Sequence, residues 1–368
     1  MIREKVKVLL VDDPAVKGYL SLKEQIDKEL NTDIIFDIVE WDKYYEKMYQ
    51  ALSNSKCDLI MAAGHLWLRE LVEKDVIDTM RIDLSDVVPK IVKELKIKDE
   101  LYLFPSFCDG HIIVYRSDII ESVIGKKLNN VITPFEYLEL SKLLHEKNES
   151  IVMKADKSEI FTDALPFLRM HKKDVYNKEG HCQCDNEEII KGLEEYCTLK
   201  RYAIKDTERC GNKEVCEAIR SGKAAMGVTW SGQMAEVMKE GCKNPEKLGF
   251  STFTTSWNTT WSFAVNKRSE KKELVMKILQ YLKNPSVDKI ISEYSGVPIR
   301  KDSYENDKGS HSWYKTELEM LNISNTLPMV SDMGEKNAIL YEAIYEAFIG
   351  EKKAKEALKE ACYRINYM

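Results

Sequence analysis

The first part of the chain alternates short, wholly apolar runs with longer amphipathic segments. The apolar runs predict three strands, at residues 5–11, 33–41 and 57–63. After each run, apolar side chains recur every three or four residues, which predicts helices at 21–30, 44–52 and 66–72. Strands that are apolar along their whole length and separated by helices indicate right-handed βαβ units. The expected fold is therefore α/β, with a parallel, doubly wound sheet.

The rest of the chain continues this pattern with a larger share of helix. Further strands are predicted at 101–107, 111–115, 224–230 and 261–267. Helices are predicted at about 134–146, 159–170, 186–202, 212–220 and 270–283, and two more between 335 and 366.

Capping residues mark several helix boundaries. Residues 133–136 read Thr-Pro-Phe-Glu, a capping box with proline at the first helical position. Ser269 is a suitable N-cap for the helix that follows it, which Pro285 ends. Glycines end two other helices, at Gly222 and Gly350.

The 368 residues are enough for two domains, each with its own core. Pro105 and Gly110 interrupt the apolar stretch around them, which suits an irregular connection between domains. The net charge is −6 and Lys and Arg are spread along the chain, which argues against nucleic acid as a partner. No apolar run approaches the roughly 18 residues of a membrane span. The N-terminus reads as a strand, so either the chain is cytoplasmic or a signal peptide has been removed from it.

Nine cysteines are an odd and rather high number, so at least one thiol is free. Five of them lie between residues 182 and 216. A zinc site made of His181, Cys182, Cys184 and a later cysteine is conceivable. The paired C-x-x-C spacing of a structural zinc site is absent, however, so small buried thiols are the favoured interpretation and no metal site is expected.

The segment 224–267 holds three of the six tryptophans, Trp230, Trp257 and Trp261, each close to Ser, Thr, Asn or Gln. Such a setting suits stacking on a flat, hydroxyl-rich ligand. The alternative is that these are core residues with satisfied N–H groups. Ligands of doubly wound sheets lie at the carboxyl ends of the strands.

The loops that follow the carboxyl ends of the first three predicted strands are residues 12–13, 41–42 and 64–67, and these are the loops expected to contact a ligand. His65 lies in the last of them, where a capping or surface histidine is the alternative interpretation.

No motif for catalysis or for a cofactor is present: the sequence has no nucleophile elbow, phosphate-binding loop, dinucleotide fingerprint or HExxH. The opening LLVDDP resembles a response-regulator receiver domain. That fold also needs an aspartate at the end of its third strand, where this chain reads Met-Ala-Ala-Gly. We therefore expect a binding protein without catalytic residues, cofactor or metal.

Six segments in order resemble the family 1 extracellular solute-binding proteins of ABC importers, the maltose-binding-like group. They include DELYLFPSFCDGHIIVYRSDII and SGKAAMGVTWSGQ, and lie at 37–63, 99–120, 221–233, 261–286, 295–303 and 350–365. Together they extend over nearly the whole chain. The resemblance implies two α/β lobes, each a mainly parallel sheet flanked by helices, which close by hinge rotation on a ligand in the cleft between them.

The resemblance also implies domain bounds and binding residues. Lobe 1 would hold 1–108 and 262–309, and lobe 2 would hold 110–260 and 310–368, with crossings near 108–111, 257–262 and 306–315. The ligand-binding residues would be Asp13, Gly64, His65, Asp109, Trp230, Trp257, Asn258 and Trp261. The chain departs from the family in lacking a secretion signal and lipid-anchored cysteine, in its many cysteines, and in having Thr259-Thr260-Trp261 where the family has two glycines.

The function implied is a monomeric, non-enzymatic protein that binds a carbohydrate or oligosaccharide and delivers it to an ABC importer permease. It would act at the extracellular face of the membrane or in the periplasm. One alternative is an intracellular ligand-sensing domain of a regulator with the same fold. Another is a binder of peptides or amines, given the acidic residues Asp12, Asp13 and Asp109.

Overall fold

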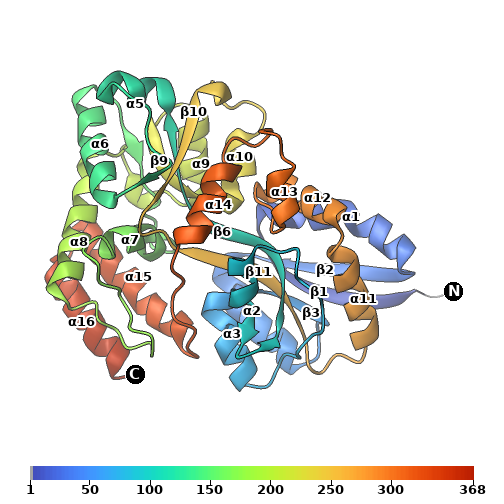
Figure 1. Cartoon of the computed structure of the whole chain (residues 1–368). Coiled ribbons are helices and arrows are strands. Elements are labelled where there is room, and N and C mark those ends of the chain that lie inside the picture. Colours follow the sequence, from blue (N-terminus) through green and yellow to red (C-terminus); the bar gives the residue numbers. More distant parts are fainter. Residues whose placement is uncertain (1–2) are drawn as a thin grey trace. The chain divides into compact units, whose positions relative to one another are not determined.

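The computed structural model describes residues 3–368, which form two compact units (Figure 1). Unit 1 consists of the residues up to Asp109 together with Thr259–Ser310, and unit 2 consists of Gly110–Asn258 and His311–Met368. The chain therefore passes from one unit to the other three times. Two of these passages lie inside strands, β6 (Leu103–Arg116) and β11 (Asn258–Val265).

Unit 1 is built on parallel strands. β1 (Glu4–Val11) pairs in parallel with both β2 (Thr32–Val39) and β3 (Leu59–Ala63), and β11 adds to β3 in the antiparallel sense. The strand order is β2-β1-β3-β11-β6. The helices that follow the first three strands are α1 (Pro14–Glu29), α2 (Trp41–Ser53) and α3 (Gly64–Glu73). The remaining elements are α4 (Pro89–Glu94), the hairpin β4 (Lys96–Ile97) and β5 (Glu100–Leu101), α11 (Lys272–Leu282), α12 (Pro285–Ser295) and α13 (Lys301–Glu305).

Unit 2 is built around the second half of β6, which pairs antiparallel with β9 (Met226–Trp230) and β10 (Leu248–Phe253). β8 (Ile151–Val152) lies parallel to β9, and β7 (Val131–Ile132) parallel to β10. The α-helices are α5 (Ser117–Ile124), α6 (Pro134–Glu146), α7 (Ile160–Leu168), α8 (Glu187–Thr198), α9 (Asn212–Arg220), α10 (Met234–Met238), α14 (Tyr314–Ile323), α15 (Met333–Ile349) and α16 (Ala354–Asn366). Short 3-10 turns are η1 (Leu199–Tyr202), η2 (Thr207–Arg209), η3 (Ser231–Gln233) and η4 (Pro245–Lys247).

Parallel and antiparallel pairs have different origins in this chain. The parallel pairs of unit 1 join strands that are connected through helices, as the apolar runs predict. The antiparallel pairs of the larger sheet all involve β6 or β11, the two strands that carry the chain from one unit to the other. The α/β fold expected from the sequence is confirmed.

Three capping predictions are confirmed. The Oγ1 of Thr133 accepts from the N–H of Glu136, whose carboxylate accepts from the N–H of Thr133, and Pro134 opens α6. Gly222 and Gly350 follow α9 and α15 with φ of +71° and +84°, which glycine adopts without strain.

Three local predictions are wrong, each for a physical reason. α1 begins at Pro14, well before residue 21, because the Asp13 side chain caps it and proline fits the first helical position. The prediction that Pro285 ends the helix before it is confirmed, since α11 ends at Leu282, and Pro285 also opens α12 behind an Asn284 cap. Ser269 does not cap α11, which begins at Lys272. Its hydroxyl accepts the N–H of Lys271, which precedes the helix, at 3.2 Å and donates to Asp58 at 2.7 Å.

The third wrong prediction is the break expected at Pro105 and Gly110, because β6 is one continuous strand of 14 residues. A Cβ at Gly110 would meet the end of the Met320 side chain, which would have to move, and would lie 3.3 Å from the carbonyl oxygen of Trp257.

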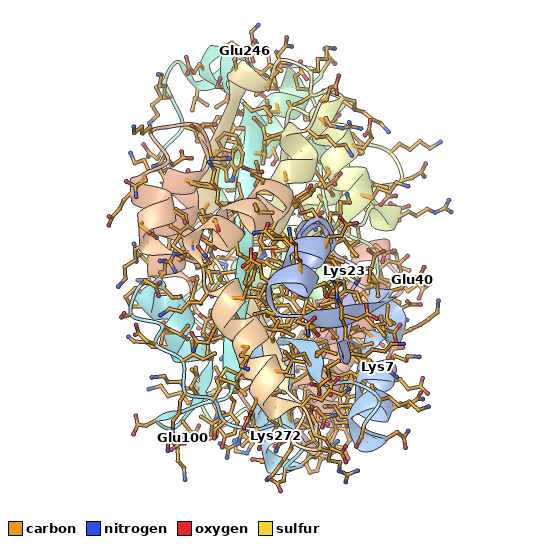
Figure 2. All side chains as sticks on the ribbon, turned by 90° about the vertical axis from the view of Figure 1, so that its right-hand side faces the viewer. Lys7, Lys23, Glu40, Glu100, Glu246 and Lys272 are labelled. Atoms are coloured by element: carbon orange, nitrogen blue, oxygen red, sulfur yellow. The ribbon has the colours of Figure 1, made fainter. Side chains whose placement is uncertain are left out.

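Charged side chains of both signs lie on the surface, among them Lys7, Glu40, Glu100, Glu246 and Lys272 (Figure 2). Within residues 3–368, none of the helices combines the length and the apolar character needed to cross a membrane.

Candidate functional site

Unit 1 brings several polar groups to one edge of its sheet. Because β1 and β3 are parallel, the residues after their carboxyl ends, Asp13 and Gly64, lie at the same edge. β11 is antiparallel to β3, with Trp261 opposite Ala63, so β11 enters the unit at that edge. β6 is the next strand in the order, and the sulfur of its Cys108 lies 3.5 Å from the hydroxyl of Thr260.

Two carboxylates at this edge influence each other. One oxygen of Asp13 accepts the N–H of Ala15 at 2.9 Å, which fixes the side chain at the N-terminus of α1. Burial, and after it the negative charge of Asp109, raise the pKa of the Asp13 carboxyl well above its usual range. The charge of Asp109 therefore acts on the carboxyl of Asp13. Such a pair suits a ligand that donates hydrogen bonds to both.

Gly64 and His65 open helix α3. A Cβ at Gly64 would lie only 3.1 Å from the carbonyl oxygen of Glu94. The backbone of Glu94 therefore leaves little room for a side chain larger than that of glycine. The Nδ1 of His65 is hydrogen-bonded to the hydroxyl of Thr259. Burial lowers the pKa of His65 to about 3, which makes the imidazole neutral at physiological pH. The neighbouring Thr260 donates to the carboxylate of Glu94 at 2.7 Å.

The neutral His65 predicts a pH dependence of stability. Its folded pKa of about 3 lies below the unfolded value of 6.5, so between these values the unfolded chain binds more protons and stability falls as the pH is lowered. From pH 7 to pH 5 the loss due to this group is about 2 kcal/mol. Urea unfolding of wild type and His65→Asn at pH 7 and pH 5 measures it, and the variant, which retains an acceptor near Thr259, should lose less by about that amount.

The matched control is His145→Asn, which alters an exposed histidine of unit 2. It should leave the difference between the two pH values as in wild type. An equal loss in wild type and His65→Asn would contradict a buried, neutral His65.

Trp261 belongs to an aromatic cluster in unit 1, which we define as Trp41, Trp67, Phe107 and Trp261. The ring of Trp261 lies 5.8 Å from Trp41, 6.1 Å from Trp67 and 6.3 Å from Phe107, centroid to centroid. Trp67 and Trp261 are buried, whereas Trp41 is 38% exposed. The exposed face of this cluster is therefore supplied by Trp41, which begins α2 directly after the loop that follows β2.

In unit 2, Trp230 is held by charged groups. The Nζ of Lys154 lies 3.3 Å from the centre of the Trp230 ring, a cation–π contact, and the indole N–H donates to Glu159 at 3.3 Å. Lys154 is fully buried. Burial raises the pKa values of the Glu159 and Asp163 carboxyl groups, and the positive charge of Lys154 is the main opposing effect, which lowers both. The result for Asp163 is a pKa raised to about 6.

Trp257 and Asn258 lie beside this group. Trp257 is 5.3 Å from Trp230, ring to ring, and its backbone N–H donates to the Nδ1 of His111 at 3.3 Å. The Nε2 of His111 lies 2.9 Å from the carbonyl of Thr162, which assigns the proton to Nε2. The side-chain oxygen of Asn258 accepts from Ser324 at 2.6 Å.

The residues predicted from the sequence thus fall into two groups. Unit 1 gathers Asp13, Gly64, His65, Asp109 and Trp261 at one sheet edge, and unit 2 places Trp230, Trp257 and Asn258 together. The sequence analysis did not select Lys154, Glu159, His111 and Thr259, and selected Trp41 only as part of a loop. Its position after a strand is the only signal that could have identified Trp41.

A small cavity lies inside unit 1. Its lining contains Tyr19, Ser106, Lys283, Asp288 and Arg300 together with apolar side chains, and its volume is about 20 Å³. That is room for about one water molecule.

Comparisons with known proteins agree with the fold. Residues 15–289 match the family model described as bacterial extracellular solute-binding protein. No curated protein sequence matches the chain. Among solved structures, a maltose-bound MalE3 of T. maritima is similar with a TM-score of 0.85 and 15% identity, and the alignment covers 99% of each chain.

Two further structures are similar over the same length. An ABC transporter solute-binding protein of Agrobacterium radiobacter K84 in complex with ribitol gives a TM-score of 0.87 at 17% identity, covering 99% of this chain and 98% of that one. An ABC transporter solute-binding protein of Thermotoga lettingae TMO bound with α-D-tagatose gives a TM-score of 0.85 at 18% identity, and the alignment covers 99% of each chain. At these identities the likeness establishes the fold.

Proposed function

Since the chain belongs to the bacterial extracellular solute-binding protein family, a non-enzymatic family of ABC transporter binding proteins, we propose that it binds a small carbohydrate or polyol and delivers it to an ABC importer. We place it at the extracellular side of the membrane, as a monomer. The similar structures contain maltose, ribitol and α-D-tagatose, three ligands that present many hydroxyl groups and little charge.

The observation that carries the proposal is the sheet edge of unit 1, where two interacting carboxylates share an edge with an aromatic cluster. A carboxylate accepts hydrogen bonds from adjacent hydroxyls, each charge-assisted contact contributing about 1.5–3 kcal/mol. An aromatic face packs against the C–H face of a sugar ring. In this proposal Asp13 and Asp109 accept from hydroxyls, and the half-exposed Trp41 stacks.

Other groups of unit 1 fit a neutral ligand. The neutral imidazole of His65 offers one donor or acceptor without a charge. Ala63, which precedes α3, has no side chain that could cap the first turn, so the N–H groups of that turn are suited to a ligand oxygen.

The contribution of unit 2 is proposed to come from Trp230, Trp257 and Asn258. Glu159 and Lys154 already occupy the indole N–H and part of the ring of Trp230, so this tryptophan would offer its remaining apolar surface. We therefore expect Trp230 to shape the ligand site and to be less able to make a polar contact with the ligand than Asp109.

A second candidate, a ligand with an amino group, is favoured by the acidic residues of unit 1. Asp12 and Asp109 both raise the pKa of Asp13, so a cation placed beside them would relieve the repulsion.

A thermal-shift screen followed by calorimetric titration tests the proposal. Maltose, ribitol and D-tagatose represent sugars and polyols, and spermidine and a short neutral peptide represent the alternatives. A ligand at a hundred times its Kd stabilises the folded protein by about 2.7 kcal/mol, which is readily seen as a higher melting temperature. Stabilisation by a sugar or polyol alone supports the proposal. Stabilisation by spermidine with no response to sugars would contradict it and favour the amine.

A further inference from the structure

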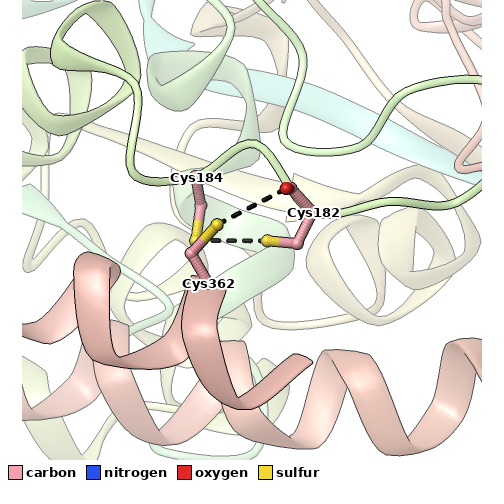
Figure 3. A group of neighbouring side chains, drawn as sticks. All are labelled: Cys182, Cys184 and Cys362. Carbon is pink, nitrogen blue, oxygen red and sulfur yellow. Dashed lines mark hydrogen bonds between the residues drawn. The ribbon is translucent and has the colours of Figure 1, made fainter. Parts of the chain in front are cut away.

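Three of the nine cysteines meet in the interior of unit 2 (Figure 3). Cys182 and Cys184 lie in the segment before α8, and Cys362 lies in α16 near the C-terminus. All three side chains are buried, and their sulfur atoms lie within 4.8 Å of one another. The Sγ atoms of Cys182 and Cys184 are 3.2 Å apart. We call these residues the thiol cluster.

Hydrogen bonds hold the thiol cluster in place from several directions. The side chain of Asn366 makes two hydrogen bonds with the backbone of Cys182, both at 2.9 Å. Its oxygen accepts from the N–H of Cys182, and its amide donates to the carbonyl of Cys182. The same amide lies 3.5 Å from the sulfur of Cys362. The thiol of Cys184 donates to the carbonyl of Leu358 at 3.2 Å, and that of Cys362 to the carbonyl of Cys182 at 3.4 Å. These hydrogen bonds therefore hold both segments that carry the cluster, the one before α8 and α16, without a bound ion.

We propose that Cys182, Cys184 and Cys362 together bind a thiophilic d10 cation, with Zn²⁺ as its most accessible representative. Three thiolates on such an ion, at metal–sulfur distances of about 2.3 Å, place the sulfur atoms about 3.8–4.0 Å apart. The Cys182–Cys184 sulfur distance of 3.2 Å is shorter than that value and all three sulfurs lie within 4.8 Å of one another, so a small side-chain adjustment completes the site.

The convergence of three sulfurs distinguishes this site from ordinary buried cysteines, which pack singly among apolar neighbours. A disulfide would use two of the sulfurs at about 2.05 Å and leave the third without a role. His181, weighed from the sequence as a fourth ligand, is exposed, and its Nδ1 lies 3.4 Å from the side chain of Asn177. It is not part of the cluster.

Metal binding would also change the protonation of the thiols and the anchoring of α16. Binding of a divalent ion displaces the thiol protons to solvent. The bound ion would tie α16 to the segment before α8.

A titration of the full chain tests the site. The protein is reduced, freed of metal with a chelator, and titrated with Cd²⁺ while the ultraviolet thiolate-to-cadmium charge-transfer band is recorded. Competition with a chromophoric chelator then gives the Zn²⁺ affinity. We expect the band to saturate at one equivalent per chain. We also expect Zn²⁺ to raise the melting temperature, because the ion binds the folded state.

Cys184→Ser and Cys362→Ser should lose the saturating band and the thermal response, and circular dichroism checks that they fold. Cys197→Ser, a cysteine of α8 outside the cluster, is the matched control and should keep both. The absence of the band in wild type, or an equal loss in Cys197→Ser, would overturn the proposal. So would a mass two hydrogens lower in protein handled in air, with a disulfide mapped to two of the three cysteines.

Discussion

Replacing Asp109 by asparagine is expected to weaken binding of the ligand found in the screen by about 10- to 150-fold. The substitution keeps the size of the side chain and removes its charge, so each hydrogen bond from a hydroxyl to the carboxylate loses its charge assistance. A loss of about 1.5–3 kcal/mol corresponds to that range of affinities. Calorimetric titration of wild type and Asp109→Asn at one pH and salt concentration measures the effect.

The control for this variant is Asp99→Asn, which removes an exposed carboxylate from the β4–β5 hairpin of the same unit. Its affinity should equal that of wild type. The variant Asp109→Asn has a second expected effect, because the charge of Asp109 is the second-largest cause of the raised pKa of Asp13. Without it, the carboxyl of Asp13 should titrate at lower pH, as NMR of the side chain would record. Unchanged affinity and an unchanged Asp13 titration would together refute the assignment of Asp109.

Much of unit 1 could be predicted because its signals are local. Apolar runs separated by helical periodicity identify β1, β2 and β3, and the carboxyl-end rule then selects the loops that hold Asp13, Gly64 and His65. These inferences need only the order of residues along the chain. The same is true of the capping box at Thr133, whose two partners are three residues apart.

What could not be predicted depends on contacts between distant residues. A proline after a helix is compatible both with an end and with a new start, and the Asn284 cap before Pro285 produces a start. The glycine at position 110 suggests a break, but β6 continues through it and packs there against Met320, some two hundred residues away. The hydrogen bond from His65 to Thr259 and the meeting of Cys182 with Cys362 are equally remote in sequence.

Lys154 is the clearest example of a residue whose importance cannot be predicted from the sequence. In the sequence it is one lysine among many, placed after the short strand β8. In the structure it is completely buried, lies over the ring of Trp230 and moderates the pKa values of Glu159 and Asp163. Burial of a lysine is tolerated only where its charge is compensated, so this cation is an integral part of the interior of unit 2.

Replacing Lys154 by methionine is expected to destabilise the protein by about 3–5 kcal/mol, because the buried carboxylates lose the cation that compensates them. The contact with Trp230 is lost as well, although methionine retains most of the volume. Urea unfolding at pH 8 followed by circular dichroism measures the free energy. The deficit should shrink as the pH is lowered towards 5. Without Lys154 the folded pKa values of Glu159 and Asp163 rise further above their unfolded values, so protonation favours the folded state.

Two further variants decide between this explanation and a simple packing defect. Lys157→Met changes an exposed lysine three residues later and should alter stability by less than about 0.5 kcal/mol. Lys154→Met combined with Asp163→Asn removes one of the uncompensated carboxylates and should recover part of the loss at pH 8, since an amide carries no charge to bury. A deficit that is the same at pH 5 and pH 8 and is not reduced in the double variant would contradict the electrostatic role of Lys154. The loss would then be assigned to the contact of its side chain with Trp230.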